Sequence, residues 1–108
     1  MGKRKKMIWA IIIEPGKAPR METIYNELHT LQRLVDGYIE VCPLAEDMVM
    51  IINEEGKLRG LPKNFWMEVI GDYIVGTAVF VGVDGDEFDD VPVTLSDLYS
   101  VMPDLLRK

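Results

Sequence analysis

The sequence predicts a single α+β domain, with a mainly antiparallel or mixed sheet of about four strands, one long helix packed on it and a short C-terminal helix. Three observations lead to this prediction. The 108 residues are 48% apolar, enough for one core at a length where one domain is usual. β-branched runs alternate with turn residues, and one segment carries apolar side chains at helical spacing. The segments follow the order β-α-β-β-β-α without repeated strand–helix–strand units, which is typical of an antiparallel α+β fold.

The first strand is expected over residues 7–13, which are continuously apolar and mostly β-branched, as in a strand covered on both faces. Residues 1–6, four of them Lys or Arg, then form a basic disordered leader, and residues 7–108 form the domain. The apolar run is far shorter than the roughly 20 residues that cross a bilayer. Glu14 and Pro15 follow it at once without a small-residue cleavage site, so a signal peptide is not expected.

A long helix is expected next, because apolar side chains recur on one face of the following segment. They are Ile24, Leu28, Leu31 and Val35, spaced i, i+4, i+7 and i+11. Thr23 is placed to cap the N-terminus, and Gly37 fits the left-handed position just beyond the C-terminus.

Two further strands are expected over residues 38–42 and 48–52, and a last strand over residues 73–83, which are rich in Val, Ile and aromatic side chains. Residues 53–57 resemble a short hairpin connection. Residues 58–64 contain Gly and Pro and are expected to form a loop.

A short C-terminal helix is expected over residues 94–102. It would be capped by Thr94 or Ser96 and would end near Pro103.

The charge balance limits the classes of partner. Twelve Lys and Arg face 18 Asp and Glu, a net charge of −6, which argues against dedicated nucleic-acid binding because that binding depends on cations neutralising phosphates. The single cysteine excludes an internal disulfide and favours a reducing, cytoplasmic location. We expect no membrane association, cofactor or metal.

Candidate catalytic groups are few. His29, the only histidine, shares a helix face with Tyr25 and Asp36, so the group would either support proton transfer or simply face solvent. Cys42 is expected to be a buried structural thiol whose pKa Glu40 raises. An enzyme would need His29 with Asp36 or Cys42. No recognised catalytic motif occurs, so we predict no catalytic residues and a protein that is not an enzyme.

The acidic run at residues 84–90 lacks the spacing of a calcium-binding EF-hand loop, since Gly85 stands second rather than sixth. We expect a solvated acidic loop there.

The segment of residues 57–66 combines three cations with two adjacent aromatic side chains and contains no acid. Cations beside rings suit a ligand that carries phosphate and a stackable base. In the alternative reading the segment is a mobile loop whose aromatic side chains lie in the core. The ligand-binding residues expected from the first reading are Lys17, Arg20, Lys57, Arg59, Lys63, Asn64 and Trp66.

Several blocks of sequence resemble a family of small proteins carried by phages and mobile elements, described as a domain of unknown function (DUF family 3846). The blocks, which span about residues 8–83, are Glu14-Pro15-Gly16-Lys17, Leu31-Gln32, Val35-Asp36-Gly37-Tyr38-Ile39-Glu40, Asn53-Glu54-Glu55-Gly56-Lys57-Leu58, Gly60-Leu61-Pro62 with Asn64, and Ile74-Val75-Gly76. The chain departs from the family pattern at Asp36, where the family usually has Gly, and at Phe65, where it usually has a basic residue. The resemblance implies a viral or mobile-element context in the host cytosol and supplies no established activity.

Two functions are therefore expected. The first is a non-enzymatic accessory protein that sequesters a phosphate-containing small molecule, such as a nucleotide-derived host immune signal. The alternative is an acidic protein–protein interaction module that inhibits a host protein through residues 84–90. A homo-oligomer is expected in either case, with the strands at residues 48–52 and 73–83, or a helix, as the contact.

Overall fold

The computed structural model describes residues 5–107, so residues 1–4 of the expected leader lie outside the described part of the chain. Its main sheet has six strands in the order β2-β1-β7-β4-β3, with β8 paired to β7, and a second sheet consists of β5 and β6. All the pairings are antiparallel. The elements are β1 (Met7–Ile13), β2 (Arg20–Tyr25), α1 (Leu28–Val35), β3 (Ile39–Ala45), β4 (Met48–Asn53), β5 (Lys63–Met67), β6 (Asp72–Val75), β7 (Ala78–Asp84), β8 (Glu87–Asp89), α2 (Leu95–Val101) and the 3₁₀ helix η1 (Pro103–Arg107).

The α+β class and the antiparallel sheet are confirmed, but the expected long helix and the expected count of about four strands are wrong. Residues 20–25 form β2, and α1 has only eight residues. Ile24 points from β2 into the same core that receives Leu31 and Val35 from α1. Ile24, a strand residue, therefore happened to continue the apolar spacing that predicted a single long helix. The cap of α1 is Glu27 rather than Thr23, and the left-handed residue at its other end is Asp36 rather than Gly37.

The expected strand at residues 73–83 is also divided. Gly76, with φ of 71°, separates β6 from β7, and the two strands belong to different sheets. Residues 63 and 64 of the expected loop begin β5. The C-terminal helix α2 agrees with its prediction, because Thr94 caps it and exchanges reciprocal hydrogen bonds with Asp97.

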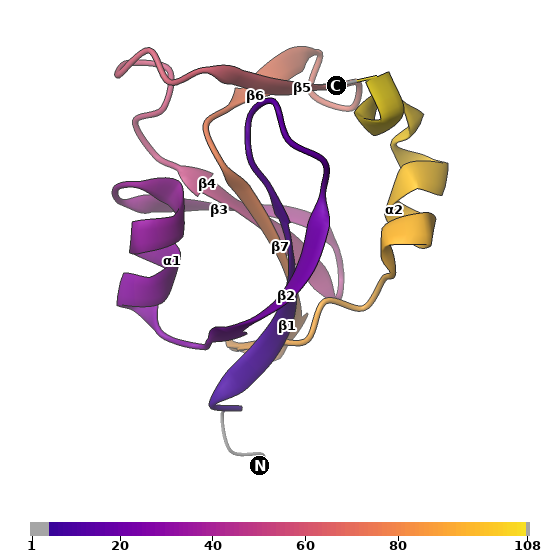
Figure 1. The fold of residues 1–108 in the computed structure, drawn as a ribbon. Coiled ribbons are helices and arrows are strands. Elements are labelled where there is room, and N and C mark those ends of the chain that lie inside the picture. Colours follow the sequence, from indigo (N-terminus) through magenta and orange to yellow (C-terminus); the bar gives the residue numbers. More distant parts are fainter. Residues whose placement is uncertain (1–4, 108) are drawn as a thin grey trace.

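The main sheet carries a hydrophobic cluster on each face. On one face α1 covers side chains from β1, β4 and β7, including Ile12, Ile51 and Val79. On the other face the β5–β6 hairpin, α2 and η1 cover a second cluster around Phe80. Figure 1 shows α1 and α2 on opposite sides of the sheet, with β5 and β6 across one end. No helix of the described residues is long and apolar enough to span a membrane.

Lys5 and Lys6 were assigned to the disordered leader, but both contact the domain. The Lys5 ammonium lies 2.7 Å from Asp89 Oδ1 and 2.9 Å from Asp90 Oδ2. The Lys6 carbonyl accepts a hydrogen bond from the Asn26 N–H at 2.9 Å. The contacts of the described domain therefore extend to Lys5 and Lys6.

Candidate functional site

The cations predicted to hold a phosphate contact acids of this chain. Arg59 Nη2 lies 3.1 Å from Asp36 Oδ2, and Arg59 Nη1 donates to the carbonyl of the same residue. Lys57 forms an ion pair with Asp72. Each of these contacts joins the loop after β4 to another segment, so the charges of Lys57 and Arg59 are already compensated.

Lys17 and Arg20 lie in and just after the β1–β2 turn. Arg20 contacts Glu14 at 2.5 Å and Glu22 at 2.7 Å, and Lys17 lies 3.6 Å from Glu14. The hydrogen bond from Arg20 lowers the pKa of the Glu14 carboxyl. These two cations therefore neutralise local carboxylates.

The other three predicted residues have different surroundings. The Lys63 ammonium lies 4.5 Å from the centre of the Tyr73 ring, and the Trp66 ring meets Tyr73 edge-on at 5.2 Å. Asn64 Nδ2 donates to the carbonyls of Ile13 and Gly76, both at 2.8 Å. Asn64 thus ties β5 to the end of β1 and to the break between β6 and β7.

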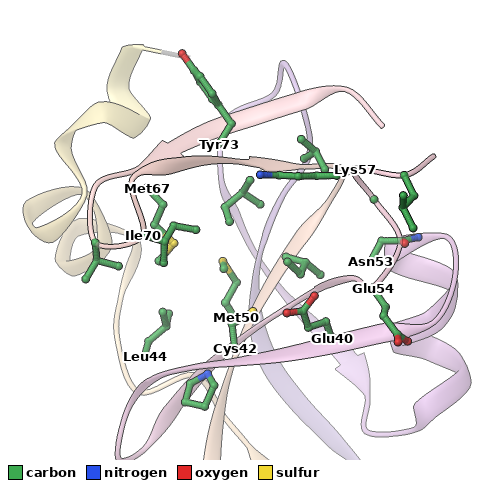
Figure 2. A pocket seen from close by; sticks show the side chains of 17 residues that line it. Glu40, Cys42, Leu44, Met50, Asn53, Glu54, Lys57, Met67, Ile70 and Tyr73 are labelled. Carbon is green, nitrogen blue, oxygen red and sulfur yellow. The ribbon is translucent and has the colours of Figure 1, made fainter. Parts of the chain in front are cut away.

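A pocket of about 420 Å³ lies between the sheet at β3 and β4 and the β5–β6 hairpin. Figure 2 shows Leu44 and Met50 pointing from the sheet toward Met67 and Ile70 of the hairpin. Cys42 also lines this pocket, and burial together with Glu40 raises the pKa of its thiol. The walls of the pocket are therefore mainly apolar.

A second pocket of about 670 Å³ lies between the same hairpin, α2 and η1. The two pockets share Leu44, Met67 and Val69 and are therefore neighbours. We refer to the two together as the apolar groove, made up of all residues that line either pocket. Of the seven predicted residues, Lys57 lines the first pocket and Trp66 the second. The structure does not bring the other five into the groove.

Large apolar side chains stand exposed along the groove. Leu58 is 91% exposed, Val69 81% and Val101 73%. Val69 lies in the turn between β5 and β6, where Gly71 adopts φ of 63° and its N–H bonds back to the Met67 carbonyl at 2.9 Å. Exposed turns ordinarily carry polar residues. An exposed apolar rim is therefore unusual and is typical of an interaction surface.

Sequence reasoning missed this rim. The available signal was the pair Val69-Ile70 directly before Gly71, which placed two β-branched residues in a short turn. The prediction from the sequence instead singled out the cations and aromatic residues of the neighbouring segment 57–66.

Two carboxylates line one end of the groove. Figure 2 shows Glu40 and Glu54 on the same side of the first pocket as Asn53. No described cation forms an ion pair with either carboxylate. The groove therefore combines apolar walls with two carboxylates that form no ion pair with a cation of the described residues.

The candidate catalytic groups are far apart in the fold. His29 Nδ1 lies 3.4 Å from Glu27 Oε2 at the exposed start of α1. Asp36 stands at the other end of that helix, and Cys42 faces the groove on the opposite side of the sheet from α1. The structure does not bring His29 together with either group.

Some carboxylates of the acidic run at residues 84–90 form hydrogen bonds and ion pairs within the fold. Asp90 Oδ1 accepts a hydrogen bond from the Trp9 N–H at 2.9 Å, and Lys5 contacts both Asp89 and Asp90. Among the described residues, no group of three or more His, Cys, Asp or Glu side chains is arranged to hold a metal ion.

A family model described as a domain of unknown function (DUF3846) matches residues 7–103. The chain belongs to this family. No curated protein and no solved structure matches the chain. Several residues that carry the resemblance serve the fold: Asn53 holds the end of α1, Gly56 packs against Val75, and Asn64 joins β5 to the end of β1 and to Gly76.

Proposed function

We propose that this protein is a non-enzymatic accessory factor of phages or mobile elements that binds a segment of a host protein in its apolar groove. The segment would carry apolar side chains and at least one basic side chain. This is the protein–protein function expected from the sequence, with the groove in place of the acidic run as the contact surface.

The exposed rim of the groove carries this proposal. Leu58 and Val69 line the first pocket and Val101 lines only the second, so a small molecule seated in one pocket would not cover all three exposed side chains. A protein segment lying along both pockets would cover them, and their burial would contribute about 25 cal/mol for each Å² of apolar surface. The geometry therefore favours a macromolecular partner over a small one.

The charges of the groove favour a basic segment. Glu40 and Glu54 form no described ion pair, and the chain as a whole carries a net charge of −6. A Lys or Arg of the partner could meet these carboxylates at the edge of the contact, where complementary charge mainly adds specificity and speeds association.

Sequestration of a phosphate ligand stays a prediction of the sequence that the geometry supports less well. Lys57 and Arg59 would have to leave Asp72 and Asp36 before they could bind a phosphate. A phosphate in the groove would also meet the carboxylates of Glu40 and Glu54.

A selection from random displayed peptides against the immobilised protein tests the proposal. We expect enriched peptides to combine apolar side chains with Lys or Arg. A synthetic copy of an enriched peptide is then titrated calorimetrically into each protein variant. We expect the Leu58→Ser variant to bind this peptide about tenfold more weakly than wild type does, because burying a leucine contributes about 1.4 kcal/mol or more.

The matched control is Leu28→Ser. Leu28 is also an exposed leucine, at 58%, but it lies on α1, across the sheet from the groove. We expect the affinity of the Leu28→Ser variant for the peptide to stay within about twofold of wild type. Equal binding by both variants, or no enriched peptide, would contradict the proposal. Heat on titration with cyclic dinucleotides, cyclic trinucleotides or ADP-ribose derivatives would favour the small-ligand function instead.

A further inference from the structure

A further pocket, separate from the groove, lies on the other face of the main sheet. It has a volume of about 200 Å³ and is formed where the start of α1 meets the hairpin of β7 and β8. Leu31 and Phe88, which pack in the cluster covered by α1, supply an apolar wall. The pocket is smaller than those that enclose drug-sized ligands, so it suits the end of a side chain or of a small molecule.

Three carboxylates line this pocket. Glu27 directly precedes α1, Asp86 lies in the turn between β7 and β8, and Glu87 begins β8. Asp86 and Glu87 form no ion pair with a cation of the described residues, and the Glu27 carboxylate lies 3.4 Å from the ring of His29. The N-terminus of α1 contributes only about half a positive charge, so the carboxylates determine the sign of the charge in the pocket.

The buried Asn26 provides an observation that is independent of these charges. The residue is only 4% exposed and lines the pocket. Its Nδ2 donates to the Phe88 carbonyl at 3.1 Å, whereas its Oδ1 accepts no hydrogen bond from the described residues. Every fully buried side-chain nitrogen or oxygen of those residues has a partner, so this Oδ1 is accessible and opens on the pocket. An amide oxygen can accept two hydrogen bonds, and one that lacks a donor at so buried a residue indicates a place for a donor from outside.

A ligand for this pocket must donate hydrogen bonds, carry positive charge and tolerate an apolar wall. A bare metal ion does not fit, because no three or more His, Cys, Asp or Glu side chains within residues 5–107 are arranged to hold one. A guanidinium or primary ammonium group on a carbon chain meets all three requirements. Its head donates to amide and carboxylate oxygens, and its stem packs on apolar side chains.

We infer that this pocket binds a guanidinium or primary ammonium group. An N–H of that group donates to Asn26 Oδ1, while the exposed carboxylates of Asp86 and Glu87 balance its charge. The group could belong to an arginine or lysine side chain of a protein or to a free polyamine, since both present the same chemistry. The inference does not depend on the function proposed for the groove, because the two sites share no lining residue.

Titrations followed by nuclear magnetic resonance test the inference, with the side-chain amide of Asn26 as the reporter. N-acetylarginine amide represents a protein side chain, and putrescine represents a free polyamine. We expect at least one of them to shift the Asn26 signals with a Kd of about 1 mM or tighter, as for other small ligands. The tighter of the two identifies the source of the group. The neutral analogues, N-acetylcitrulline amide and the diol that corresponds to putrescine, should bind about tenfold more weakly or worse.

Three variants distinguish this pocket from general attraction by an acidic protein. Asp86→Asn and Glu87→Gln should each weaken binding by about threefold or more, because each removes one carboxylate beside the ligand. The matched control is Glu46→Gln in the turn between β3 and β4, which removes the same charge outside the pocket and should bind like wild type.

The inference is overturned if neither probe shifts the Asn26 signals. It is also overturned if the neutral analogues bind as tightly as the cations. An equal loss of affinity in Glu46→Gln, Asp86→Asn and Glu87→Gln would likewise overturn it, because net charge alone would then account for the binding.

Discussion

At the scale of single residues, the buried Asn53 shows how one polar side chain fixes a loop and a helix together. Its Nδ2 donates to the carbonyls of Val35 and Asp36, both at 3.0 Å, and its Oδ1 accepts from the Glu55 N–H at 2.7 Å. The carbonyls at the end of a helix lack partners within the helix. Asn53 supplies a partner for them and also sets the start of the loop that leads to Leu58 on the groove rim.

Replacement of Asn53 should therefore be costly. We expect Asn53→Ala to lower the free energy of unfolding by about 2 kcal/mol, because buried hydrogen-bonding groups lose their partners. Asn53→Asp should lower it at least as much, since a carboxylate would face the negative end of α1. Urea denaturation followed by circular dichroism measures both, and a loss under about 0.5 kcal/mol for Asn53→Ala would contradict this role.

At the scale of elements, the pairing of β7 with β8 depends on the absence of a side chain at Gly82. A Cβ there would overlap the backbone carbonyl oxygen of Asp90, which cannot move without displacing β8. The nearby Gly85 is different, because an added Cβ would meet nothing within 4 Å, but its φ is +66°. One glycine is required by close approach and the other by backbone conformation.

The two glycines should respond differently to substitution. We expect Gly82→Ala to lower the free energy of unfolding by about 2 kcal/mol or more, and Gly82→Asn to be no better tolerated. Gly85→Ala should lower it by about 1 kcal/mol, with part of this loss recovered in Gly85→Asn because Asn adopts left-handed conformations more readily. Thermal unfolding of the four variants measures these losses of stability. Equal losses at both positions would disprove the conclusion that Gly82 is required by close approach and Gly85 by backbone conformation.

The elements also explain where prediction from the sequence succeeded. The strand Met7–Ile13 and the helix capped by Thr94 were predictable because their signals are local: a continuous apolar run and a capping sequence. The length of α1 was not, because Ile24 and Leu31 fill one core from two different elements. Periodicity along a chain cannot distinguish two elements that point at the same core.

At the scale of the whole molecule, a cluster of charges joins the start of the described chain to its later part. The N–H of Trp9 and the ammonium of Lys5 lower the pKa of Asp90, and Lys5 lowers the pKa of Asp89. Their pKa values in the fold lie below the ordinary value of 3.8. The ionised carboxylates therefore stabilise the fold above that pH, and the stabilisation is lost as the pH falls through the lowered values.

The variant Asp90→Asn should reveal this dependence. We expect its free energy of unfolding at pH 7 to be lower than that of wild type by less than about 1 kcal/mol, as for exposed ion pairs. The difference should shrink as the pH falls below 3.8 and vanish once Asp90 is protonated. Unfolding curves at several pH values measure this, with Asp86→Asn as a control in the same acidic run. A constant difference across the acid range would refute it.

The candidate site was less predictable than the fold, for reasons of distance along the chain. Lys57 and Arg59 looked like free cations because their partners, Asp72 and Asp36, are 15 and 23 residues away. The groove combines strands β3 to β6 with a later helix, so its outline exists only in the folded chain. The sequence could indicate the segment that contributes to the site but not which of its side chains face the opening.

The position of Cys42 in the wall of the first pocket has a practical consequence. It is the only cysteine of the chain, so a thiol-alkylating reagent can mark that wall without any engineered label. A bound molecule in the pocket would shield the sulfur and slow its alkylation, and mildly alkaline buffer would compensate for the raised pKa. The native protein thus carries its own chemical reporter of occupancy.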